Sequence, residues 1–104
     1  MSGGTGVEHE TLDGEEIRAL IAGNTVTGSM SSGQNYAEFY AKDGTIRGDG
    51  YTGTWSIADH AMCFDYGEGE TCYRVAADGK SVTWILDGEV DGTGIVREGN
   101  PMEM

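Results

Sequence analysis

Short turn signals recur along this chain at intervals that leave room only for short strands between them. The turn dipeptides are Asp43-Gly44, Asp49-Gly50, Asp59-His60, Gly67-Glu68, Asp78-Gly79 and Asp87-Gly88. Asp-Gly pairs are typical of type I′ hairpin turns, and a leading glycine suits type II′. The pattern therefore indicates antiparallel strands that follow one another directly along the sequence.

The segments between the turns predict eight strands. They occupy residues 24–30, 35–42, 45–48, 51–58, 61–66, 69–77, 80–86 and 89–97. Glycine supplies 18 of the 104 residues and proline one, which suits tight turns. A long meander must protect its edges, and closing into a barrel does so. The predicted fold class is all-β, an eight-stranded antiparallel up-and-down barrel, with an open or split barrel as the alternative.

One short helix is expected before the strands, at residues 13–22. Asp13 can cap it, and Gly23 closes it. Ile17, Leu20 and Ile21 follow the spacing of one apolar helix face. The expected organisation is a flexible tail at 1–10, a single barrel domain at 11–98 and a flexible end at 99–104.

The turns also predict which side chains face inward, because partners across a hairpin share a face. The expected partners are Ala41 with Ile46, Trp55 with Phe64, Ile57 with Met62, Tyr73 with Trp84 and Val75 with Val82. The same alternation predicts an inward face of Ala37, Phe39, Ile46, Tyr51, Gly53, Trp55, Ile57, Met62, Phe64, Tyr73, Val75, Val82, Trp84 and Leu86. The opposite face is polar, as the outside of a small barrel requires.

The charge of the chain restricts its partners. Asp and Glu number 18 against 6 Lys and Arg, a formal net charge of −12. Without a basic footprint, binding to nucleic acid or to an anionic membrane surface is not expected. No apolar run approaches the roughly 20 residues that span a bilayer. The first residues do not look like a signal peptide, so we expect either a cytoplasmic protein or a mature exported domain.

Cys63 and Cys72 are the only cysteines. A hairpin centred on Gly67-Glu68 places them opposite each other, where Cα atoms lie about 4.5–5.5 Å apart, within the range of a disulfide. A structural disulfide is favoured over free thiols, a redox switch or a metal site, because there is no C-x-x-C motif. A disulfide favours a periplasmic or secreted location. No metal or cofactor is assigned.

An acidic segment near the C-terminus imitates a calcium-binding loop. Asp87, Glu89, Asp91 and Glu98 fall at its first, third, fifth and twelfth positions, with Gly92 at the sixth. The third position carries Glu, and the flanking segments are predicted strands rather than helices. The favoured interpretation is a hairpin turn, with calcium binding left open.

Asp91 has a second interpretation, because the turn at Asp87-Gly88 pairs it with Trp84 and directs it toward the aromatic face. A carboxylate there needs hydrogen-bond donors or a raised pKa. It could orient a ligand or act as an acid or base, or it could hydrogen-bond Tyr73, a threonine or Arg97. No serine has a histidine partner for a hydrolytic triad, and no catalytic residue is assigned.

The aromatic interior carries the functional prediction. Its residues are Phe39, Tyr51, Trp55, Phe64, Tyr73 and Trp84. The width of an eight-stranded barrel favours rings that simply fill it. The functional alternative is a pocket in which these rings and Asp91 bind a small apolar or aromatic molecule. Two other functions stay open: a protein-interaction or inhibitor module acting through its surface or residues 1–10, and a small acid/base isomerase.

The meander and the motif Gly53-Thr54-Trp55 resemble the calycin group, the lipocalin and avidin-like barrels. In lipocalins a Gly-x-Trp marks the first strand, whereas here it marks the fourth, so no ligand-site residue is transferred. With residues 24–28, 51–57 and the Cys63…Cys72 hairpin, residues 12–101 are similar to small bacterial exported proteins, which implies a periplasmic or secreted barrel. The shape also resembles the bacterial metalloprotease-inhibitor barrel, which carries one disulfide.

Overall fold

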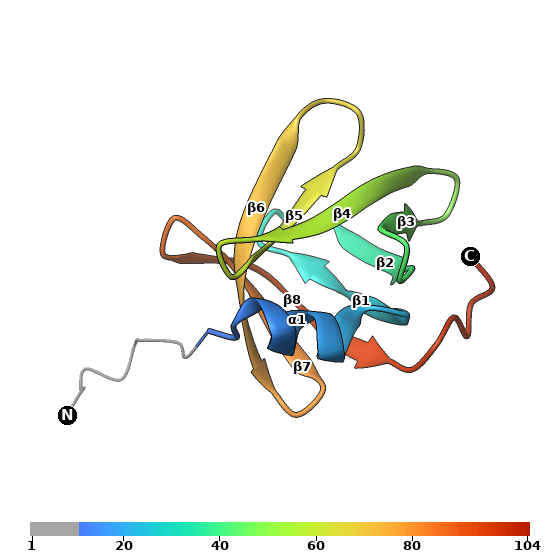
Figure 1. Ribbon diagram of the computed structural model, residues 1–104. Helices are drawn as coiled ribbons and strands as arrows, with labels where there is room; N and C mark the ends of the chain where they lie inside the picture. The colour runs from blue at the N-terminus through green and yellow to red at the C-terminus, as the bar shows by residue number, and fades with distance from the viewer. Residues whose placement is uncertain (1–10) are drawn as a thin grey trace.

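A computed structural model describes residues 11–104, in which one helix precedes eight strands. The elements are α1 (Gly14–Ile21), β1 (Asn24–Met30), β2 (Asn35–Tyr40), β3 (Thr45–Arg47), β4 (Thr52–Ala58), β5 (Ala61–Asp65), β6 (Glu70–Asp78), β7 (Ser81–Leu86) and β8 (Glu89–Arg97). Each strand pairs antiparallel with its neighbours in sequence, and β8 returns to β1 to close the barrel (Figure 1). The predicted fold class is confirmed.

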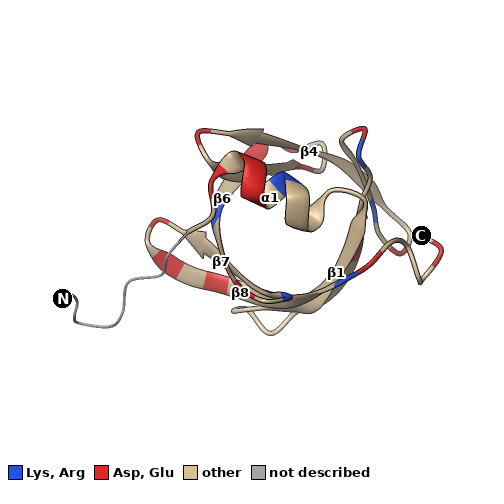
Figure 2. Cartoon of the chain, turned by 60° about the horizontal axis from the view of Figure 1, so that its bottom comes forward, with Lys and Arg blue, Asp and Glu red and all other residues tan. Residues whose placement is uncertain are grey.

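The helix α1 closes one end of the barrel. A capping box starts it: the Asp13 carboxylate accepts the Glu16 N–H at 2.8 Å, and the Glu16 carboxylate accepts the Asp13 N–H at 2.9 Å. Figure 2 looks onto this end and shows α1 lying across the ring of strands. Ile17 and Ile21 are completely buried and face the interior. The helix therefore fills its half of the barrel with apolar side chains.

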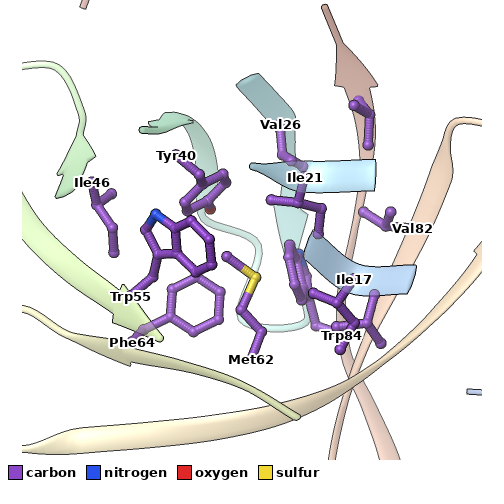
Figure 3. Close-up of a cluster of buried hydrophobic side chains, with 12 residues drawn as sticks. Ile17, Ile21, Val26, Tyr40, Ile46, Trp55, Met62, Phe64, Val82 and Trp84 are labelled. Atoms are coloured by element: carbon purple, nitrogen blue, oxygen red, sulfur yellow. The ribbon is translucent and has the colours of Figure 1, made fainter. Parts of the chain in front are cut away.

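The core joins α1 to the inner faces of the strands, as Figure 3 shows. Its strand residues are Val26, Tyr40, Ile46, Trp55, Met62, Phe64, Val75, Val82, Trp84 and Val96. Trp55 belongs to the helix side of this core, where its indole N–H donates to the Ala41 carbonyl at 2.9 Å and the Arg18 guanidinium lies 5.3 Å from its ring centre. Seven of the fourteen predicted inward residues belong to this core, and Ile57 and Tyr73 pack against it.

Two of the predicted hairpin registers are confirmed. Trp55 pairs with Phe64 across β4 and β5, because Asp59 and His60 take φ values of 52° and 62°, which a type I′ turn needs. The hairpin of β5 and β6 also has the predicted register.

The register of β2 against β3 differs from the prediction. Tyr40, not Ala41, pairs with Ile46. The loop has three residues rather than two, and its last residue, Gly44, takes a φ of 97°. A shift of one residue turns every side chain of a strand to the other face. The predicted inward positions of Ala37 and Phe39 are therefore wrong: both residues lie on the outer face of β2, while Glu38 lies on its inner face.

The last two hairpins show smaller departures. The β6–β7 turn is Gly79-Lys80 rather than Asp78-Gly79, so Val75 pairs with Trp84 instead of Val82. Pairing moves by two residues, which leaves the faces unchanged. Between β7 and β8 a bulge at Trp84 pairs it with Gly92 rather than Asp91.

At the ends of the chain, the tail predicted at 1–10 lies outside the described residues. The flexible end predicted at 99–104 contains a turn in which Asn100 and Met104 exchange hydrogen bonds of 2.6 and 2.9 Å. Within residues 11–104, no helix has the length and apolar character needed to cross a membrane.

Candidate ligand-binding site

The end of the barrel opposite α1 holds a pocket of about 990 Å³ that opens to solvent. Because Ile17 and Ile21 occupy only the helix side, the interior is filled at one end and hollow at the other. All five tyrosines of the chain line the pocket, together with Phe64 and Trp84. These tyrosines are Tyr36, Tyr40, Tyr51, Tyr66 and Tyr73.

Phe64 is the centre of the aromatic wall. Its ring lies edge-on to Tyr40, Tyr73 and Trp84, with ring centres 5.9, 5.6 and 5.4 Å away. It also stacks on Tyr66, with an interplanar angle of 13° at 6.5 Å. Edge-to-face and offset pairs of this kind stabilise one another beyond the area they bury. The wall is therefore a fixed surface rather than a set of independent rings.

A carboxylate, Glu38, lies in this wall and is 6 % exposed. Three tyrosine hydroxyls surround it: Tyr40 donates to it at 2.7 Å, Tyr51 at 2.6 Å, and Tyr66 lies 2.9 Å from both oxygens. We call Glu38 with these three tyrosines the tyrosine cage. A protonated carboxyl could donate to only one hydroxyl, so the cage suits the ionised form, which only accepts.

The cage has no basic member. The ion pair found within residues 11–104 joins Lys80 to Glu98 on the surface, away from Glu38. Glu38 is also the only charged side chain that is buried in this part of the chain. Hydroxyl donors satisfy its hydrogen bonds without neutralising its charge. The wall of the pocket therefore carries a negative charge with no protein cation beside it.

Two glycines leave the space that the Tyr51 and Tyr66 rings of the cage occupy. A Cβ on Gly48 would lie 2.2 Å from the Tyr51 ring, and one on Gly53 would lie 2.8 Å from the Tyr66 ring. Each ring thus covers a backbone position that carries no side chain. Tyr51 lies in the turn between β3 and β4 and Tyr66 in the turn between β5 and β6, so three separate segments build the cage.

Burial and the Glu38 charge both act on the tyrosine hydroxyls. Burial raises the pKa of Tyr40 well above its ordinary value, and the neighbouring Glu38 raises it further. Burial is also the larger cause for Tyr66 and Tyr51, whose pKa values are raised, with Glu38 second. The deprotonated form would bring a second negative charge to a buried carboxylate. The cage hydroxyls therefore stay protonated and keep donating.

Two further networks tie tyrosines to the opposite wall. Tyr36 donates to the Thr93 carbonyl at 2.9 Å and accepts the Trp84 indole N–H at 2.7 Å. Burial raises the pKa of Tyr36 to about 12. Tyr73 donates to the Asp91 carboxylate at 3.3 Å, and burial, followed by the charge of Asp91, raises the pKa of Tyr73.

The structure separates the predicted site residues. Tyr51, Phe64, Tyr73 and Trp84 line the pocket. Asp91 reaches its edge through Tyr73, one of the structural partners considered for it, and also accepts from Ser31 at 3.1 Å. The remaining two do not line it: Trp55 lies in the core and Phe39 on the outer face.

Sequence reasoning missed Glu38, Tyr36, Tyr40 and Tyr66. Three of them alternate along β2, and the signal that could have placed them is Gly44, a glycine at the third position of a three-residue hairpin loop. With that loop length the inward set becomes Tyr36, Glu38 and Tyr40. Tyr66 lies in a loop, where strand alternation gives no direction.

The candidate calcium residues are not brought together. Asp87 lies in the turn at one end of β8, while Glu98 follows its other end and pairs with Lys80. Nine extended residues between them span roughly 30 Å. The grouping of Cys63, Cys72 and Glu70 near one another offers no thiolate, because the two sulfurs form the predicted disulfide.

The arrangement combines an aromatic surface, one buried charge and an open entrance, which are the features of a site for a small organic molecule. No protein family, curated protein or solved structure matches the chain.

Proposed function

We propose that this protein binds a small molecule in the pocket at the open end of the barrel, with the aromatic wall around Phe64 as the main contact surface. The observation that carries the proposal is a hollow of about 990 Å³ beside a core that is otherwise closely filled. Small-molecule sites have volumes of about 300–1,000 Å³ and aromatic walls with few polar groups. The resemblance to calycin-like barrels agrees with this function.

The two tryptophans allow a direct test. Trp84 lines the pocket, whereas Trp55 lies in the core on the helix side. In a Trp55→Phe variant, Trp84 is the only indole, so a ligand in the pocket should change its emission. In the reciprocal Trp84→Phe variant, the emission of Trp55 should not respond. Apolar and aromatic compounds that leave the Trp84 signal unchanged at millimolar concentration would contradict the proposal.

A blocking variant tests the location. Thr71 lines the pocket, pairs with Phe64 and is exposed at the entrance, so Thr71→Phe should occupy part of the hollow and weaken binding. Thr54→Phe places the same ring on the outer face of β4 and serves as the control, with binding retained. Equal weakening by the two variants would remove the pocket from the proposal.

We also propose that the protein acts in the periplasm or outside the cell, since disulfides persist in oxidising compartments. The support is the Cys63–Cys72 disulfide, which joins β5 to β6. Alkylation of thiols at the moment of cell lysis tests this. The cysteines of the natural protein should be blocked to alkylation until a reductant is added, whereas immediate alkylation would favour the cytoplasm.

A further inference from the structure

The tyrosine hydroxyls of the pocket have their donor protons engaged with the protein, while their oxygen lone pairs remain available as acceptors. Each of the five tyrosine hydroxyls donates its proton to the protein: three to Glu38, one to the Thr93 carbonyl and one to Asp91. The Trp84 N–H is also used, by Tyr36. A hydroxyl that donates still has lone pairs with which to accept. Tyr51 and Tyr66, which are 41 % and 47 % exposed, offer such lone pairs to the pocket. A ligand group that contacts the Tyr51 and Tyr66 oxygens must therefore bring donors, whereas Gln34, Asn35, Thr52 and Thr71 supply donors elsewhere in the lining.

The charges of the pocket have one sign. Glu38, Asp49 and Glu68 line it, and no Lys, Arg or His of the described chain does. Residues 1–10 contain one histidine, His9, and no Lys or Arg. A net charge of −12 adds a long-range attraction for cations and a repulsion for anions. A carboxylate or phosphate ligand would meet repulsion, and no residue among 11–104 that lines the pocket could form an ion pair with it.

The position of Glu38 selects the kind of cation. Its two oxygens already receive four short contacts from tyrosine hydroxyls. A metal ion would have to displace those hydroxyls, because it binds carboxylate oxygens directly. An ammonium group needs no such displacement, since it can donate to the Tyr51 and Tyr66 oxygens while the Glu38 charge lies directly behind them. Phe64 and Trp84, which are 7 % and 3 % exposed, line the pocket beside the cage and form the apolar surface under the body of such a ligand.

We propose that the ligand is a protonated organic amine, with its nitrogen at the tyrosine cage and its apolar body against the wall formed by Phe64 and Trp84. This inference rests on the proposed small-molecule function and names the chemical class of the ligand. In the cage, Glu38 supplies the negative charge, and the hydroxyls that it orients supply the acceptor atoms.

Matched probes test the head group. Calorimetric titrations at pH 7 would use three trios that share a body (4-phenylbutyl, 2-naphthylethyl and octyl) and end in an amine, an alcohol or a carboxylate. The amine of a trio should bind at least about tenfold more tightly than its alcohol, since a hydrogen bond with a charged partner exceeds a neutral one by roughly that factor. The carboxylate should bind most weakly.

Glu38→Gln removes the charge with little change of shape. It should lower the affinity for the amines about tenfold or more and leave the alcohols within about twofold, so that the head-group preference disappears. Glu15→Gln makes the same change of charge on the exposed side of α1, at the other end of the barrel, and should leave the preference intact. Equal loss in both variants would mean general attraction to an acidic protein and would overturn the inference.

The possible results separate the two proposals. Alcohols or carboxylates that bind as tightly as amines would overturn the amine inference while supporting a small-molecule pocket. No binding by any member of the three trios would overturn both. If Glu38→Gln does not fold, the order of the head groups on the unaltered protein still decides, and Tyr51→Phe, which removes one half-exposed acceptor, should weaken the amines more than the alcohols.

Discussion

The tyrosine cage holds the buried Glu38 carboxylate by neutral donors alone. The position of one of these donors depends on the missing side chain of a glycine beneath its ring. Gly48 has no side chain, and the Tyr51 ring lies over it. The contact atoms belong to the far end of a half-exposed side chain, which can swing into solvent. A methyl group at this position would therefore open the cage without disturbing the strands.

Gly48→Ala should displace the Tyr51 hydroxyl from Glu38 and lower the free energy of unfolding by about 1.5–3 kcal/mol, the contribution of a hydrogen bond to a charged group. Tyr51→Phe should have a similar cost. The double variant should cost no more than the larger single change, because both remove the same contact. Urea denaturation of the four proteins gives the cycle, and additive losses would show that Gly48 acts elsewhere.

At the scale of elements, turns decided what could be predicted. Asp59 and His60 set the β4–β5 register correctly because both residues of that turn take left-handed conformations. Gly44 belongs to a longer loop, and one extra residue moved Phe39 out and Glu38 in. The barrel and most of its core survive such an error, since seven other pairings close it. The cage could not be predicted with this error, because its central residue, Glu38, lies on β2, the strand whose register was shifted.

We expect α1 to stabilise the barrel by packing its apolar face into one end of it. Ile21 is fully buried, so Ile21→Ala should lower the free energy of unfolding by about 2–5 kcal/mol. Ile95→Ala is the matched control, because Ile95 is 43 % exposed on β8, and its cost should stay below about 1 kcal/mol. Thermal or chemical denaturation compares them. Similar costs would mean that α1 is not packed into the barrel.

The disulfide stabilises the hairpin of β5 and β6 locally. Cys63 and Cys72 are nine residues apart, and closing a loop of this size corresponds to about 2–3 kcal/mol of stability in the chain-entropy description. A phosphine reductant should lower the denaturation midpoint accordingly while leaving the far-ultraviolet spectrum unchanged. A Cys63→Ala/Cys72→Ala variant should not respond to the reductant, and loss of the barrel on reduction would contradict a local role.

At the scale of the whole molecule, every tyrosine lies at one site, so absorbance reports on the pocket as a unit. Burial raises the pKa of each, that of Tyr36 to about 12, against an ordinary value of 10. Well below pH 10 the folded and unfolded chains bind the same tyrosine protons. Between about pH 10 and 12 the unfolded chain loses protons that the folded chain keeps, so stability should fall as the pH rises.

An alkaline titration followed at 295 nm should show little tyrosinate near pH 10 in the folded protein and then a steep rise that coincides with loss of the near-ultraviolet circular dichroism signal. In concentrated guanidinium chloride the same residues should titrate near pH 10, which provides the reference. A folded protein whose tyrosines titrate smoothly around pH 10 would contradict the buried hydroxyl network.

Because α1 blocks the end of the barrel opposite the pocket, the interior is open at one end only and is not a channel through the molecule. A ligand bound as proposed would have to leave by the opening through which it entered, and a second molecule could not displace it from behind. Its exchange would then depend on its own dissociation rate and not on the concentration of a competitor.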